Sequence, residues 1–267
     1  EFIFCGRKQI DLTDQESIYS IYDIKPGLVI NCAAYTAVDK AEEEQSLAFH
    51  INSTALEHMG KVCHELNIPI IHFSSDYVYH NHLRRPLVES DPTTPQGIYA
   101  QSKLGGEQAL RREHPYPLIF RVSWLYSTFG QNFPKTMLRL GKERSELKVV
   151  SDQIGAPTNA ADLAAAVLQI VHTHTKPEDW KSISGIYNYA NEGQTHWAGI
   201  AAFLMEQAGL SCKINEIPSS EYPTPAPRPP YSLLDLGKFT RIFNLPLVTW
   251  TTSMQRCLQA LLNENPG

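Results

Sequence analysis

Short apolar runs alternate with longer amphipathic segments along the first part of the chain. Residues 28–31, 70–73 and 118–122 have the length and apolar character of buried strands, and helices are expected between them over 45–66 and 98–114. Strands that are separated by helices join parallel neighbours through right-handed crossovers. The alternation therefore predicts an α/β fold built on a parallel sheet.

The segments before residue 28 and after residue 122 follow this alternation less regularly. A first strand is expected at residues 2–5, and a helix is expected to begin at Thr13, because Thr13-Asp14-Gln15-Glu16 has the form of a capping box. Residues 172–184 read as a polar connection, and residues 218–230 contain six prolines, too many for regular structure. Further helices and strands are expected at residues 132–144, 147–150, 159–171, 185–189, 195–208, 213–217, 235–243 and 252–263.

The composition argues against several classes of function. The chain has 23 basic and 28 acidic residues, a net charge of −5, which argues against a nucleic-acid partner. Its five cysteines are odd in number and form no C-x-x-C pair, as is usual for reduced thiols. No apolar run approaches about 18 residues and no signal peptide is recognisable, so a cytoplasmic protein without membrane contact is expected. The pairs His80/His82 and His172/His174 lack neighbours with the spacing of a metal site, so no metal is expected.

Tyr99 and Lys103 stand four residues apart in a predicted helix and therefore share one face. An ammonium near a phenol lowers the phenol pKa, which would make Tyr99 a proton donor or acceptor near neutral pH. The same spacing also occurs by chance on amphipathic helices. Ser75 and Asp76 follow the strand at 70–73, at the end of a parallel strand where ligands bind. Ser75, Tyr99 and Lys103 are thus predicted to converge on one carbonyl oxygen.

Longer motifs carry a resemblance that covers the chain from residue 1 to its end. They begin with Asn31-Cys32-Ala33-Ala34-Tyr35-Thr36-Ala37-Val38-Asp39-Lys40-Ala41-Glu42 and continue at residues 74–79, 99–107, 121–124, 132–138, 152–158 and 222–229. In order and spacing these motifs resemble those of dTDP-4-dehydrorhamnose reductase, a family of the extended short-chain dehydrogenase/reductase superfamily. The resemblance implies a Rossmann-like doubly wound parallel sheet with a smaller C-terminal substrate-binding lobe. It implies an NAD(P)-binding domain at residues 1–150 and a mainly substrate-binding lobe at 151–267, some segments of which return to the main domain.

The resemblance also implies a reaction and its site. NADPH, or alternatively NADH, would reduce the C4 keto group of dTDP-4-dehydro-L-rhamnose to give dTDP-L-rhamnose, and a homodimer is compatible with this reading. The implied catalytic residues are Tyr99, Lys103 and Ser75; the family usually has Thr where Ser75 stands, which keeps the hydroxyl. The implied cofactor contacts are Asp11, Leu12, Ala34, Tyr35, Thr36, Tyr99 and Lys103. The implied substrate contacts are Ser75, Asp76, Tyr99, Trp124, Asn132 and Arg228.

Three of these assignments keep an alternative. Trp124 would stack on the sugar or base, although a single tryptophan also serves as a core residue. Arg228 lies among prolines, where it would reach the diphosphate or remain a surface cation. Arg7 and Lys8 follow the expected first strand, where an NAD site usually has an acid, so they suit the 2′-phosphate of NADPH or are solvated cations.

One departure from the family pattern, together with the motifs shared by related enzymes, keeps other functions open. The sequence contains no glycine-rich phosphate loop, so a strand, loop and helix of about 25 to 30 residues are expected before Glu1; the alternative is that dinucleotide binding has been lost. An epimerase on a nucleotide sugar would share most of the motifs. A dehydratase would need an Asp-Glu pair, whereas Tyr77 follows Asp76. A non-catalytic regulatory subunit on the same fold is the remaining rival.

Overall fold

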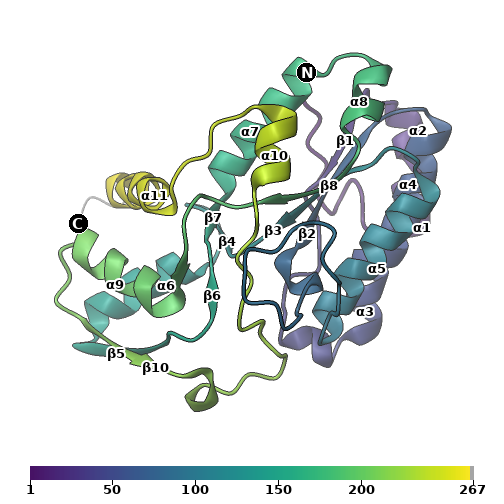
Figure 1. The fold of residues 1–267 in the computed structure, drawn as a ribbon. Helices are drawn as coiled ribbons and strands as arrows, with labels where there is room; N and C mark the ends of the chain where they lie inside the picture. Colours follow the sequence, from purple (N-terminus) through teal and green to yellow (C-terminus); the bar gives the residue numbers. More distant parts are fainter. Residues whose placement is uncertain (265–267) are drawn as a thin grey trace.

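The computed structural model describes residues 1–264. At its centre lies a four-stranded sheet in the order β1-β2-β3-β8, and all three neighbouring pairs are parallel (Figure 1). The strands are β1 (Val29–Asn31), β2 (Ile70–Ser75), β3 (Leu118–Val122) and β8 (Gly185–Tyr189). The α/β fold with a parallel sheet that the alternation predicts is therefore confirmed.

Helices cover both faces of this sheet because successive side chains of each strand point to opposite faces. Ile70 and Ile119 pack toward one helical layer, whereas Ile71 and Phe120 pack toward the other. The first layer lies beside the sheet in the right half of Figure 1 and consists of α1 (Gln15–Tyr19), α2 (Ile21–Ile24), α3 (Gln45–Phe49), the π-helical turn η2 (His50–Thr54), α4 (Ala55–Glu65) and α5 (Ile98–Glu113). The second layer consists of α7 (Ala160–Thr173), α8 (Pro177–Ile183) and α10 (Gly237–Phe243).

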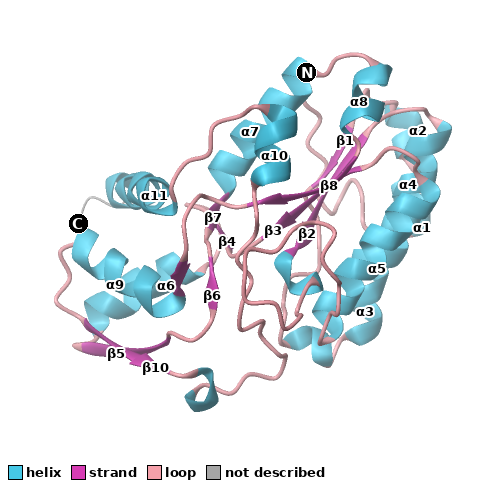
Figure 2. Cartoon of the chain, viewed as in Figure 1, coloured by secondary structure: helices cyan, strands magenta, loops and turns pink. Residues whose placement is uncertain are grey.

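A smaller lobe with its own apolar core lies beside the main sheet. Its two strands, β5 (Glu146–Val150) and β10 (Lys213–Ile217), pair in parallel, separate from the main sheet (Figure 2). They pack with α6 (Phe133–Glu143), α9 (Trp197–Gln207) and α11 (Trp250–Glu264). The lobe thus draws on both sides of residue 150, while α7, β8 and α10 return to the main sheet.

Short elements connect the two cores. Two-residue strand pairs join β4 (Leu125–Tyr126) to β7 (Thr158–Asn159) and β6 (Ile154–Gly155) to β9 (Thr195–His196). Single 3-10 turns occur at η1 (Lys40–Glu42), η3 (Asp76–Val78) and η4 (Ser219–Glu221). Among the described residues, no helix is both long and apolar enough to cross a membrane.

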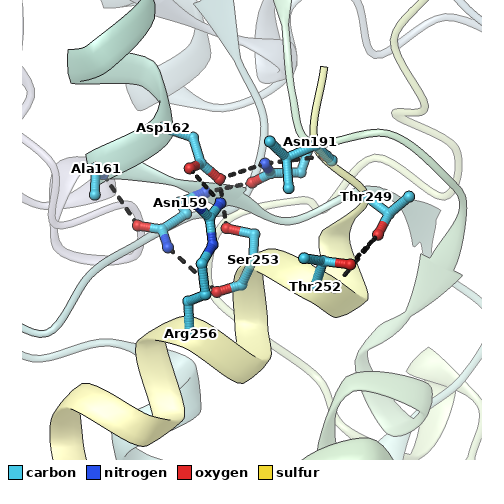
Figure 3. A network of polar contacts seen from close by, with 9 residues as sticks. Asn159, Ala161, Asp162, Asn191, Thr249, Thr252, Ser253 and Arg256 are labelled. Atoms are coloured by element: carbon cyan, nitrogen blue, oxygen red, sulfur yellow. Dashed lines mark hydrogen bonds and ion pairs between the residues drawn. The ribbon is translucent and has the colours of Figure 1, made fainter. Parts of the chain in front are cut away.

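A polar network fixes α11 against α7 (Figure 3). Asn159 caps α7, and its amide also contacts the backbone of Ser253 on α11. The carboxylate of Asp162 accepts hydrogen bonds from Asn191 at 2.7 Å, Ser253 at 2.5 Å and Arg256 at 2.7 Å. The network therefore joins the second helical layer to the last helix of the smaller lobe.

Three local expectations are wrong. Residues 2–5 are exposed and form no strand, because no segment of the described chain offers them a hydrogen-bonding partner. Asp14 rather than Thr13 caps the first helix: Asp14 accepts the Glu16 amide, while the Thr13 hydroxyl is bound to Asp11. The polar connection at 172–184 contains α8, because Trp180 and Ile183 are buried in the sheet core.

Candidate active site

A cavity of about 510 Å³ opens at the carboxyl ends of β1, β2 and β3. Ligands of open α/β sheets bind at this edge, and cavities of roughly 300–1,000 Å³ are typical of small-molecule sites. The loop after β1, the end of β2, the first turns of α5 and the start of α6 line the cavity. Trp197, Ile200 and Met254 of the smaller lobe complete it, so the site lies between the two cores.

The glycine pair of the α5 motif lets this helix approach its neighbour closely. A Cβ atom on Gly106 would lie 2.0 Å from the backbone oxygen of Asn52 in η2. The buried Asn52 amide donates to the Tyr35 carbonyl at 3.0 Å and to the Ser102 hydroxyl at 3.0 Å. It also accepts the Tyr35 backbone amide at 2.9 Å. The loop after β1, η2 and α5 are therefore held together as one unit beside the cavity.

Ser75 and Tyr99 meet at the edge of the cavity. The Ser75 hydroxyl donates to Asp76 Oδ1 at 3.0 Å and accepts the Tyr77 amide at 3.2 Å. The Tyr99 ring meets the Tyr77 ring edge-on, with ring centres 5.6 Å apart. Burial raises the pKa of Tyr99 to about 12, although the Ser75 hydroxyl acts in the opposite direction. The phenol therefore keeps its proton at neutral pH.

Lys103 lies one turn further along α5 and is 2% exposed. Its ammonium donates to the Phe73 carbonyl at 2.6 Å and lies 3.4 Å from Nε2 of His72. Burial lowers the pKa of Lys103 to about 8, and the Glu107 carboxylate acts against this shift. The expectation that Lys103 lowers the pKa of Tyr99 is wrong for this structure, because burial of the phenol dominates and the ammonium is bound to the strand.

Asp76 is a buried carboxyl group at the cavity wall, 2% exposed. Its Oδ2 atom has no hydrogen-bond partner among the described residues. Burial raises the pKa of Asp76 to about 6, and the Ser232 and Ser75 hydroxyls offset only part of this shift. Asp76 is thus a carboxyl group with a free acceptor next to a cavity.

Trp124 forms an aromatic wall together with a residue that the sequence motifs do not single out. The Trp124 and Trp197 rings stack with centres 4.1 Å apart and planes 20° apart. The Trp197 indole nitrogen donates to Gln153 at 3.0 Å, and Phe133 meets its ring edge-on. A Cβ atom on Gly155 would lie 2.7 Å from the Trp124 ring, so this position has room for glycine alone. The wall is built from distant segments, and no local signal marks Trp197.

Three of the other predicted contacts also line the cavity. Ala34 and Thr36 border it after β1, and Asn132 borders it at the start of α6. The Asn132 side chain also caps α6, because its oxygen accepts the Lys135 amide at 3.1 Å. Its amide nitrogen donates to the Ser127 carbonyl at 2.7 Å.

The remaining predicted contacts do not line the cavity. Hydrogen bonds from Thr13, together with Arg7, hold the pKa of Asp11 at about 2, and Leu12 packs in the core of the first helical layer. The Tyr35 side chain is buried and donates to Glu44. The Arg228 guanidinium forms an ion pair with Asp39 at 2.7 Å and binds the Ala226 carbonyl, so its charge is already partnered.

Comparison with known proteins shows the family to which the chain belongs. A family model described as the RmlD substrate binding domain matches residues 1–263. The dTDP-4-dehydrorhamnose reductase of Sinorhizobium fredii is 39% identical over 99% of this chain and 90% of its own length. The enzyme of the same name from Escherichia coli K12 is 40% identical over 97% of this chain and 86% of its own length.

A solved structure shows the same arrangement of elements. The crystal structure of dTDP-4-dehydrorhamnose reductase from Bacillus anthracis in complex with NADP aligns with a TM-score of 0.89 and 32% identity. The alignment covers 96% of this chain and 89% of that one. By the family model, by these relatives and by its fold, the chain belongs to the dTDP-4-dehydrorhamnose reductase family.

Proposed function

We propose that this protein uses NADPH to reduce the C4 keto group of dTDP-4-dehydro-L-rhamnose, giving dTDP-L-rhamnose. The observation that carries the proposal is the meeting of Ser75, Tyr99 and Lys103 at one cavity, at the carboxyl ends of parallel strands. Membership of the reductase family supports the same reaction. The combination of a protonated phenol, a hydroxyl and an ammonium is suited to receiving a carbonyl oxygen that gains negative charge.

The end of the cavity next to β1 fits the nicotinamide end of a dinucleotide. Ala33 and Ala34 have small side chains, so a dinucleotide can approach the backbone after β1 closely. Lys103 brings N–H donors to the same wall of the cavity. Ala34, Thr36 and Lys103 would hold the cofactor there, while contacts from Asp11, Leu12 and Tyr35 stay predictions of the resemblance. When bound, NADPH supplies the hydride that reduces the keto group.

The side chains of this protein position the sugar and supply the proton. Tyr99 gives its phenolic proton to the C4 oxygen, because a pKa of about 12 keeps the phenol protonated at neutral pH. The Ser75 hydroxyl can turn from Asp76 to donate to the same oxygen. Lys103 places a positive charge near the oxygen and the cofactor, which favours the negatively charged intermediate state.

The opposite side of the cavity supplies the substrate contacts. Asp76 lines this side, and its unpaired, buried Oδ2 can accept a sugar hydroxyl once the side chain rotates toward the cavity. The part of the Trp124 ring that borders the cavity and is not covered by Trp197 offers an apolar surface for the sugar or base. Asn132 borders the same space. Arg228 is the weaker candidate, because a diphosphate would have to compete with Asp39 for its guanidinium.

The proposal is tested by measuring the turnover of dTDP-4-dehydro-L-rhamnose, with the loss of NADPH absorbance as the readout. Tyr99→Phe keeps the ring but removes the proton, so kcat should fall by about two to four decades with little change in the Kd for NADPH. Lys103→Met should weaken both turnover and NADPH binding, because the ammonium has a role in each. Full activity of Tyr99→Phe would refute the assignment of the proton donor.

The same assay separates the rival functions. An epimerase would convert the sugar without net consumption of NADPH, and a regulatory subunit would give no turnover at all. Either result would overturn the proposed reduction. A cytoplasmic location, the absence of nucleic-acid partners and a homodimer are further proposals, which fractionation and light scattering would check.

A further inference from the structure

Two buried polar side chains lie beneath Lys103 and take no part in the mechanism above. Asn31 ends β1, and His72 stands opposite it on β2 in the parallel ladder. The two residues are 5% and 1% exposed. Polar groups this deeply buried need hydrogen-bond partners, so the pattern of their bonds determines which atoms carry protons.

The orientation of the Asn31 amide is fixed by the backbone. The Ala33 N–H donates to Asn31 Oδ1 at 3.1 Å, which leaves the Asn31 nitrogen facing Nδ1 of His72 at 3.1 Å. An amide nitrogen can only donate, so Nδ1 accepts and carries no proton. Burial and the neighbouring Lys103 charge hold the pKa of His72 well below its usual range, and the ring is therefore neutral. Because the Asn31 contact at 3.1 Å is shorter than the Lys103 contact at 3.4 Å, we assign the single proton of the ring to Nε2.

This tautomer determines what Lys103 can bind. The Nε2–H group of His72 faces the Lys103 ammonium at 3.4 Å, and two donors cannot bond to each other. One of the three ammonium protons is bound to the Phe73 carbonyl. The other two are left for the cavity. If Nε2 carried the lone pair instead, the imidazole would accept from the ammonium and hold it against the sheet.

Among the described residues, no other charged group that faces Lys103 is free to compete for these protons. The Glu107 carboxylate lies one turn further along α5, but Arg121 of β3 binds it at 2.6 Å and the Ser74 hydroxyl binds it at 2.5 Å. The orientation of the ammonium therefore depends on the strand beneath it, through Phe73 and His72.

We propose that Asn31 and His72 form a positioning pair, in which Asn31 fixes the His72 tautomer so that the imidazole cannot accept from Lys103 and the ammonium donors point to the cofactor. The inference rests on the proposed function, since NADPH is the ligand that those donors would meet. Asn31 acts through His72, and His72 acts through Lys103.

A direct test is the ¹⁵N NMR spectrum of the histidine side chains, with His72 assigned by its loss in His72→Phe. The wild type should show a neutral His72 with the proton on Nε2 from about pH 6 to pH 8. A proton on Nδ1, or an imidazolium over this range, would overturn the inference. This measurement needs no substrate and no turnover.

A functional test uses Asn31→Asp. The new carboxylate can only accept, so the single proton of the His72 ring should move from Nε2 to Nδ1 and bond to it. Nε2 then has a lone pair that accepts from Lys103, and the Kd for NADPH should rise about ten- to a hundredfold. Adding His72→Phe removes that acceptor and should restore most of the affinity. Equal weakness of the single and double variants would refute the coupling. Failure of the wild type to bind NADPH would instead refute the proposed function, while the tautomer remains measurable.

Discussion

The carboxyl group of Asp76 should make folding stability depend on pH in a direction opposite to that of most acidic residues. Its pKa is raised from 3.8 to about 6, because the charged form loses its hydration on burial. The folded protein therefore holds this proton more tightly than the unfolded chain does. Stability is lost as the pH rises from about 4 to about 6, and the full cost is present above that range.

The size of this cost follows from the shift. One pKa unit corresponds to about 1.4 kcal/mol, so a shift of about two units corresponds to about 3 kcal/mol. Asp76→Asn has no charge to bury at any pH. The free energy of unfolding of Asp76→Asn, relative to the wild type, should therefore increase by about 3 kcal/mol between about pH 4 and pH 8.

Urea unfolding of both proteins across this pH range measures the difference. Asp91→Asn is a matched control, because hydrogen bonds from Arg85 and the Val88 amide lower the pKa of Asp91. The free energy of unfolding of Asp91→Asn, relative to the wild type, should change little between about pH 4 and pH 8, because a lowered pKa makes stability depend on pH only below the unfolded value of 3.8. A difference between Asp76→Asn and the wild type that stays flat across the range would show that Asp76 is not a buried, poorly satisfied carboxylate.

Two further substitutions probe the wall of the cavity and the packing of α5. Trp124→Ala should cost roughly 1–3 kcal/mol of substrate binding in a titration, by analogy with base–aromatic stacking, and should leave NADPH affinity nearly unchanged; loss of cooperative folding would assign Trp124 to the core instead. Gly106→Ala should lower the free energy of unfolding by about 1–3 kcal/mol, because its Cβ atom meets the Asn52 backbone. Gly105→Ala should cost less, because its Cβ atom would meet the movable Ser53 side chain at 3.0 Å and Phe49 only at 3.8 Å; equal losses would contradict the packing argument.

The regular elements were predictable because their signals are local. β8 and β10 have the bounds that their apolar runs predict, and the parallel sheet follows from the alternation of strands with helices. The two-residue strands β4, β6, β7 and β9 carry no periodicity and were missed. Residues 2–5 have a strand-like composition, but a strand also needs a neighbour, which composition does not describe.

The features of the candidate site also divide into those with a local sequence signal and those without one. The spacing of Tyr99 and Lys103 and the position of Ser75 after an apolar run are local features, and the structure places all three at one cavity. Trp197 reaches the wall from a distant segment, and the bond between Arg228 and Asp39 spans most of the chain. The rise in the Tyr99 pKa depends on burial, which spacing cannot reveal. The catalytic roles of Ser75, Tyr99 and Lys103 stay predictions until the activities of the variants are measured.

The attachment of α11 to α7 has a consequence for the timing of synthesis. Ser75, Tyr99 and Lys103 are made early, whereas Met254, which closes the cavity, lies on α11 beside the Ser253 bond to Asp162. At about 5–20 residues per second, a ribosome takes roughly ten to forty seconds to travel from Ser75 to Met254. During that interval the nascent chain contains Ser75, Tyr99 and Lys103 but lacks Met254, so the cavity wall is incomplete. A premature stop before Trp250 would release that open form permanently.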